Sequence, residues 1–184
     1  MKALLDAISR EVTEVLAHVS EEEFLAFGAS LRKAERIFVA GEGRSGLMGK
    51  AFAMRLMHAG YDAFAVGETI TPSIGPADVL VAISGSGTTE TVHLYASQAR
   101  KSGASVLLVT TNRHSKIAEY SDGTLRIPAA TKKRLEDEPP TIQPLGNQFD
   151  QCLHLLLDAV VIHLLSESNR HGDRELAQRH SNLQ

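Results

Sequence analysis

The run Ser84–Glu90 (SGSGTTE) combines the residue types of an anion-binding loop. It directly follows an apolar run, Val79–Ile83, that has the character of a buried strand, and a helix is predicted from about Thr88. Glycines let a ligand approach backbone N–H groups, and a helix start favours negative charge. Because the loop has hydroxyls but no P-loop lysine, it favours a terminal sugar phosphate over a nucleoside triphosphate. The plainer interpretation is a Ser/Thr-rich turn that only caps the helix.

A second glycine loop, GEGRSG at residues 41–46, follows another apolar strand and formally matches the dinucleotide-binding pattern GxGxxG. Glu68, just past the next strand, even stands where such a fold places its ribose-binding acid. Two features argue against that interpretation: the chain has no room for a separate substrate domain, and the Ser-rich loop would have no role. Two Gly/Ser loops at successive strand ends instead indicate one shared pocket. Arg44 is then a candidate ligand for sugar hydroxyls or phosphate, or else a surface arginine.

The elements that must position these loops alternate along the chain. Apolar runs predict strands at residues 37–40, 61–66, 79–83, 106–110 and 124–127. Helices are predicted over residues 1–19, 21–34, 45–59, 88–102, 115–120 and 147–166, with Ser20 and Glu23 forming a capping box. Strands without alternation, separated by helices, predict an α/β fold with a five-stranded parallel sheet between two helix layers, a flavodoxin-like three-layer sandwich.

The chain is expected to form a single domain over residues 1–184, with N-terminal helices (1–34), a sheet core (35–166) and a polar tail (167–184). Residues 128–146, which contain Lys132-Lys133-Arg134, are interpreted as a solvated loop. The formal net charge of −3 argues against a nucleic-acid binder. One cysteine, no signal-peptide pattern and no apolar run long enough for a bilayer predict a cytoplasmic protein without a membrane partner. No spacing typical of metal ligands is visible.

Several segments together resemble the 6-phospho-3-hexuloisomerase family of SIS (sugar isomerase) domain proteins. They are both glycine loops, AFAMRLMH at residues 51–58, VGE at 66–68, QPLG at 143–146 followed by Phe149, and RHSNL at 179–183. The resemblance runs from about residue 35 to 165. It implies interconversion of 3-hexulose 6-phosphate and fructose 6-phosphate in the ribulose monophosphate route of formaldehyde fixation. It also implies a homotetramer with no metal or organic cofactor.

The resemblance also implies roles for particular residues. Substrate-binding positions would be Ser45, Ser84, Gly85, Ser86, Gly87, Thr88 and Thr89. The general base would follow the PLG turn, where this chain has Asp150 and the family usually has Glu. The shorter side chain withdraws the carboxylate by about one methylene, and catalysis is sensitive to shifts of about 1 Å. Either the backbone moves or another acid acts, with Glu90 and Glu68 as further candidates. Asp150 could also simply close a capping box with Asn147 as N-cap.

His58 lies in the last turn of a predicted helix, about 20 Å from the helix start where the phosphate loops gather. It is either a helix-end histidine that favours the C-terminal dipole, or a group that serves the active site of a neighbouring subunit together with His180. The surplus apolar surface of the last helix favours assembly. The alternatives for function are an isomerase of arabinose 5-phosphate or sedoheptulose 7-phosphate, and a sugar-phosphate sensor without turnover.

Overall fold

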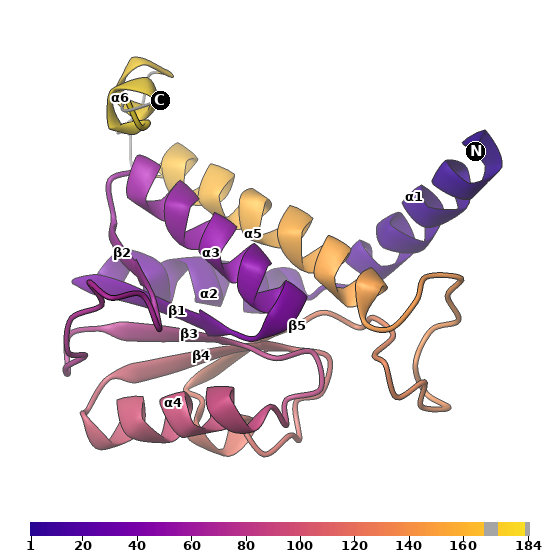
Figure 1. Ribbon diagram of the computed structural model, residues 1–184, viewed down its shortest axis with the longest axis horizontal. Coiled ribbons are helices and arrows are strands. Elements are labelled where there is room, and N and C mark those ends of the chain that lie inside the picture. Colours follow the sequence, from indigo (N-terminus) through magenta and orange to yellow (C-terminus); the bar gives the residue numbers. More distant parts are fainter. Residues whose placement is uncertain (168–172, 183–184) are drawn as a thin grey trace.

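A single parallel sheet lies at the centre of the computed structural model, which describes residues 1–167 and 173–182 (Figure 1). Its strands are β1 (Arg36–Gly41), β2 (Asp62–Ala65), β3 (Val79–Ile83), β4 (Ser105–Thr110) and β5 (Gly123–Arg126). The strand order is β2-β1-β3-β4-β5, and every neighbouring pair is parallel. This is the flavodoxin-like order, and it confirms the predicted five-stranded sheet.

Helices cover both faces of the sheet. One layer contains α1 (Lys2–Leu16), α2 (Glu21–Lys33), α3 (Gly43–His58) and α5 (Asn147–Glu167), and the other contains α4 (Glu90–Lys101) and the short 3-10 helix η1 (Ala118–Tyr120). Figure 1 shows α3 and α5 side by side above the sheet and α4 below it. The three-layer arrangement predicted from the sequence is therefore confirmed.

Residues of the central strands point alternately into two separate cores. In β1, Val39 packs with α3 and α5, whereas Phe38 and Ala40 pack with α4. All five residues of β3 are buried. A strand that is buried on both faces needs apolar residues at every position, which explains the continuous apolar runs in the sequence.

The loop after β1 is closed by a tight contact between two glycines. A Cβ atom on Gly46 would lie 2.4 Å from the carbonyl oxygen of Gly41, a backbone atom that cannot move aside. The third glycine of the GxGxxG pattern is thus needed for close packing of α3 against β1.

We expect Gly46→Ala to destabilise the fold by about 1–3 kcal/mol, because the added methyl group overpacks the strand–helix junction. Gly75→Ala is the matched control, since a Cβ there would meet no atom closer than 3.7 Å, an ordinary van der Waals distance. Its effect should stay within about 0.5 kcal/mol. Urea unfolding of both variants measures the difference, and equal stabilities would contradict the packing argument.

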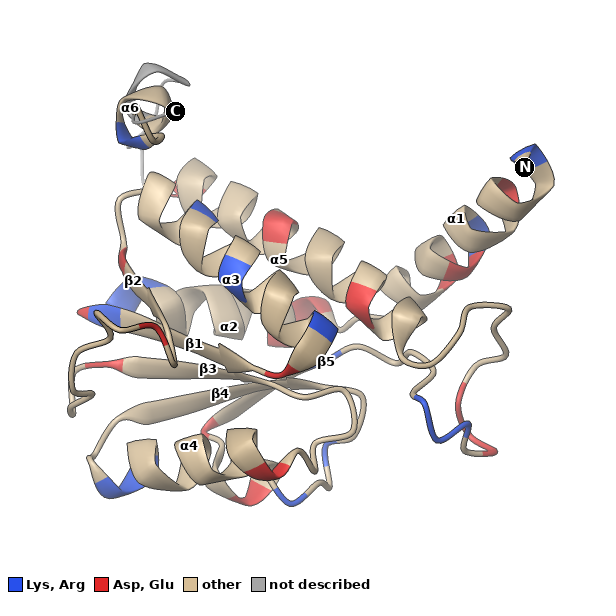
Figure 2. Cartoon of the chain, viewed as in Figure 1, with Lys and Arg blue, Asp and Glu red and all other residues tan. Residues whose placement is uncertain are grey.

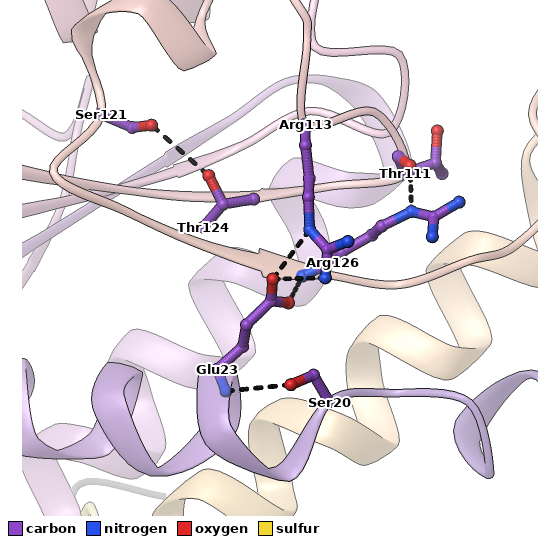
Figure 3. Close-up of polar contacts among 7 residues, drawn as sticks. All are labelled: Ser20, Glu23, Thr111, Arg113, Ser121, Thr124 and Arg126. Atoms are coloured by element: carbon purple, nitrogen blue, oxygen red, sulfur yellow. Dashed lines mark hydrogen bonds and ion pairs between the residues drawn. The ribbon is translucent and has the colours of Figure 1, made fainter.

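The start of α2 differs in part from the predicted capping box. Ser20 Oγ does accept a hydrogen bond from the Glu23 backbone N–H, at 3.3 Å. The Glu23 carboxylate, however, does not reach back to Ser20. It accepts from the backbone N–H of Arg126 (2.9 Å) and from Nε of Arg113 (2.8 Å), as Figure 3 shows. A cationic donor and an N–H group on the edge strand β5 compete successfully for this carboxylate, so the reciprocal half of the box was wrong.

The C-terminal part of the chain also departs from the sequence pattern. The polar tail contains a further helix, α6 (Asp173–Arg179), which packs on the end of α3, with the Arg179 guanidinium close to Gly60. Leu183, part of the tail resemblance, lies outside the described residues. At 21 residues, α5 is long and apolar enough, by length and composition, to cross a membrane, but half of that stretch is buried. It packs against α1, α2 and α3, a position typical of a core helix.

Candidate active site

A pocket of about 480 Å³ opens at the carboxyl ends of β1 and β3. The helices that follow these two strands, α3 and α4, leave toward opposite faces of the sheet, and such a switch point is where open α/β sheets bind ligands. The pocket is lined by Glu42, Gly43, Arg44, Ser45, Gly85, Ser86, Thr89, Thr131, Lys132, Leu145, Gly146, Phe149 and Asp150. Both glycine loops thus line one pocket, as their places at successive strand ends indicated, and the start of α5 lines it too.

Asp150 is a buried carboxylate in this pocket, with an exposed fraction of 7%. The hydroxyl group of Ser45 donates a hydrogen bond of 2.6 Å to its Oδ1, and Nε of Arg44 lies 3.8 Å from Oδ2. Burial raises the pKa of Asp150 above its ordinary value, and the Ser45 hydrogen bond and the Arg44 charge only partly offset this effect. A carboxylate that holds a proton more readily than usual is suited to accept one from a substrate carbon.

The alternative that Asp150 closes a capping box with Asn147 does not explain the hydrogen bond that its carboxylate makes. Helix α5 begins at Asn147, and the backbone N–H of Asp150 donates to the carbonyl of Gly146, which places Gly146 rather than Asn147 at the N-cap. Asn147 uses its amide to donate to Gln143 Oε1. The carboxylate of Asp150 is instead bonded to Ser45, 105 residues away in the sequence. Its main partner therefore lies across the pocket.

The Ser-rich loop lies against the first turn of α5, where Gly85 approaches the ring of Phe149. Ser84 and Thr89 share a hydrogen bond of 2.8 Å between their hydroxyl groups, and Ser86 and Thr88 share one of 3.0 Å. Thr89 is the N-cap of α4, but its side chain makes no capping hydrogen bond. The first N–H groups of α4 are thus left without a side-chain cap, as at many anion-binding helix starts.

The loop is locked in place by close contacts on both sides. A Cβ on Gly85 would meet the ring of Phe149 at 3.2 Å, and one on Gly87, where φ is +67°, would lie 2.1 Å from Oγ of Ser115. The carbonyl of Gly85 accepts from both the backbone N–H and the hydroxyl of Thr111. Only Gly85, Ser86 and Thr89 of this loop line the pocket, whereas Ser84 is buried beneath it.

The two other acids predicted as candidate bases do not reach this pocket. Glu68 is paired with Lys50 and Glu90 with Lys116, and their side chains are 51% and 79% exposed. Neither lines the pocket. Within one chain, the geometry therefore favours Asp150 over Glu68 and Glu90.

His58 and His180 lie together at the far end of α3. Their rings stack with centroids 5.3 Å apart, and both line an apolar cavity of about 600 Å³ between α3, α5 and α6. Burial, followed by the nearby His180 and Arg55, lowers the pKa of His58, so its imidazole is neutral near pH 7. Ser45 is in the first turn of α3 and His58 is its last residue. Neither histidine lines the pocket that contains Asp150.

The sequence interpretation did not name several residues that line the pocket, among them the carboxylate residue Glu42. Thr131 and Lys132 belong to the segment after β5, which was interpreted as a solvated loop, yet both line the pocket. The topology of the sheet could have indicated this position, because segments that follow parallel strands all emerge at the same edge of the sheet.

The sequence profile described as the SIS domain matches residues 30–141, more than half of the chain. The chain belongs to the SIS domain family. The two glycine loops at the ends of β1 and β3 lie within the matched residues.

This SIS domain is similar to named relatives along nearly its whole length. A Bacillus subtilis protein named 3-hexulose-6-phosphate isomerase is 36% identical over 177 residues, covering 96% of this chain and 95% of that protein. A Mycobacterium gastri protein with the same name is 38% identical over 182 residues, covering 98% and 89%. A crystal structure of a Methanococcus jannaschii protein is also similar, with a TM-score of 0.84, 32% identity and 99% coverage of both chains. A function as 3-hexulose-6-phosphate isomerase was inferred for that protein from its structure.

Proposed function

We propose that this SIS domain interconverts 3-hexulose 6-phosphate and fructose 6-phosphate through an enediol. The observation that carries the proposal is the buried Asp150, hydrogen-bonded to Ser45, in a pocket that also contains the hydroxyl and glycine loop at the start of α4. A proton acceptor and a phosphate-binding loop are what an isomerase of phosphorylated sugars requires. The choice of 3-hexulose 6-phosphate among phosphorylated sugars is based on the names of the similar proteins. We expect the enzyme to act in the cytoplasm.

In the proposed reaction, the Ser86 and Thr89 hydroxyls and the first N–H groups of α4 bind the phosphate. The Asp150 carboxylate removes the proton from C2 of the 3-hexulose while the C3 carbonyl oxygen gains a proton, which gives the 2,3-enediol. The O2 hydroxyl then loses its proton as C3 gains one, so that the carbonyl moves to C2. Arg44, next to Asp150, is placed to stabilise negative charge on the sugar oxygens.

Incubating the purified protein with fructose 6-phosphate in deuterated water tests this function. Deuterium should enter at C3 of fructose 6-phosphate, the carbon that loses its proton when the 2,3-enediol forms, and NMR measures the exchange. A sugar-phosphate sensor would bind without exchange. Parallel incubations with arabinose 5-phosphate and sedoheptulose 7-phosphate test the other isomerases, and faster exchange with either would overturn the assigned substrate.

The surface of α3 and α5 supports the proposal of a homotetramer. Half-exposed apolar side chains follow one another at helical spacing on both helices: Met54 and Met57 on α3, Leu155 and Ile162 on α5. In Figure 2 most of the length of these two adjacent helices is uncharged, with separate basic positions on α3 and acidic positions on α5. Exposed apolar side chains on two adjacent helices are typical of an interface between subunits.

Within such an assembly, we propose that His58 and His180 serve the pocket of a neighbouring subunit. Their distance from the Asp150 pocket of their own chain, about 20 Å along α3, excludes direct action there. A neutral His58 could exchange a proton or bind a sugar hydroxyl group across the interface.

Mixing two inactive variants tests the shared site. Asp150→Asn and His58→Ala subunits, once exchanged, should recover about a quarter of the wild-type activity, because about one interface in four then combines an intact Asp150 with an intact His58. Each variant mixed with itself is the control. No recovery after demonstrated subunit exchange, or a fully active His58→Ala, would show that the site is not shared.

A further inference from the structure

Lys132 is one of the charged residues that line the Asp150 pocket. The cations that line the pocket are Arg44 and Lys132. Arg44 lies 3.8 Å from Asp150, so its charge is already partly engaged. In the part of the chain that the structure describes, no ion pair includes Lys132, and its side chain is exposed.

The backbone on both sides of Lys132 is held by hydrogen bonds. The N–H of Ala130 donates to the buried Gln148 Oε1 at 2.8 Å. Glu138 accepts from both the backbone N–H (2.9 Å) and the hydroxyl (2.5 Å) of Thr131. The hydroxyl of Thr131 accepts in turn from the N–H of Lys133. The Cα of Lys132 is thus fixed, while its long side chain remains free to reach into the pocket.

Arg134 completes this arrangement. Its guanidinium donates to the carbonyl groups of Thr131 (2.8 Å) and Gln143 (2.5 Å), which joins the two ends of the loop. Its φ of +51° lies in the left-handed region, which side chains other than glycine rarely adopt. Such a conformation persists where surrounding contacts determine it, and it is found preferentially at functional sites.

The charges of the residues that line the pocket indicate a role for Lys132 in balancing the phosphate. Two carboxylates, Glu42 and Asp150, and two cations, Arg44 and Lys132, line the pocket, so the formal charges of these side chains sum to zero. A sugar phosphate adds about two negative charges at pH 7. The Ser-rich loop offers hydroxyl and amide donors but no cation. An ammonium group on a flexible stem is a mobile point charge that can follow the phosphate.

We propose that Lys132 binds the phosphate of the substrate as its cationic partner, and that Glu138 positions Lys132 through Thr131. The identity of the sugar in this proposal rests on the proposed function. The contact between Lys132 and a phosphate group does not. Lys133, its exposed neighbour, does not line the pocket and supplies the matched comparison.

The experiment compares Lys132→Ala with Lys133→Ala. In Lys132→Ala, both the KM for fructose 6-phosphate and the calorimetric Kd for inorganic phosphate should rise about 10-fold with kcat nearly unchanged, as for a lost charge-assisted partner. Lys132→Arg should recover most of the loss, and Lys133→Ala should match the wild type. The salt dependence of phosphate binding should also weaken in Lys132→Ala only.

Unchanged phosphate affinity in Lys132→Ala, or an equal loss in Lys133→Ala, would overturn the proposal. A wild-type protein that binds phosphate through Lys132 yet shows no deuterium exchange would overturn the isomerase function and support the Lys132 contact. For the positioning role, Glu138→Gln should weaken phosphate binding in the wild type but add nothing in Lys132→Ala. Equal effects in both backgrounds would show that Glu138 does not act through Lys132.

Discussion

Replacing Asp150 with Asn is expected to lower kcat by about 10²–10⁴, the usual contribution of a general base. Asn can still accept the hydrogen bond from Ser45 but cannot take a proton from carbon. Steady-state rates with fructose 6-phosphate measure the effect. Circular dichroism checks that the variant is folded. Near-normal turnover in this variant would mean that Asp150 is not the base. Asp150→Glu, which lengthens the side chain by one methylene, then tests whether the shorter acid limits the rate.

The stability of the same variant separates catalysis from a structural role. Because burial raises the pKa of Asp150 in the folded state, the folded protein holds this proton more tightly than the unfolded chain does. The free energy of unfolding should therefore fall as pH rises from the unfolded pKa through the raised folded pKa. Asp150→Asn removes this dependence and should be as stable as the wild type, or more so, at neutral pH. A large loss of stability would instead indicate a structural carboxylate.

Replacing Ser86 with Ala is expected to raise KM by a factor worth about 1–3 kcal/mol, because a hydroxyl donor to the charged phosphate is lost. Ser86 is partly exposed and lines the pocket, whereas its hydrogen-bond partner Thr88 does not line it. The value of kcat should change much less than KM, since the phosphate does not react.

Ser97→Ala is the matched control for this change. Ser97 lies in α4, two turns beyond the loop, and does not line the pocket. Its KM should equal that of the wild type. Equal KM values in all three proteins would reject the assignment of Ser86 to the phosphate, and an equal rise in both variants would point to a general effect on α4.

Much of the fold could be predicted because its signals are local. The continuous apolar run at residues 79–83 predicted a strand that is buried on both faces, and Ser20 predicted the start of α2. Parallel strands connected by helices then place both glycine loops at one edge of the sheet. The sharing of one pocket by these loops follows from that topology.

The details of the site depended on contacts between residues far apart in the sequence. Whether Asp150 would cap its own helix or reach Ser45 depends on how closely α5 and α3 pack. Likewise, Glu23 could reach Ser20 or Arg126, and only the position of the edge strand β5 decided between them. A side chain with two competing partners follows the one that packing brings within hydrogen-bond distance, and the local sequence does not record that distance.

The sequence by itself thus determined the strands, the two glycine loops and the side of the sheet on which they meet, because backbone periodicity and turn chemistry act over a few residues. Only the tertiary structure decided that Glu68 and Glu90 point to lysines outside the pocket, and that Lys132 belongs to it. The physical reason is that the burial, ion pairing and pKa of a charged side chain depend on its neighbours in space. Long-range packing determines those neighbours, so side chains of the same type can have different roles.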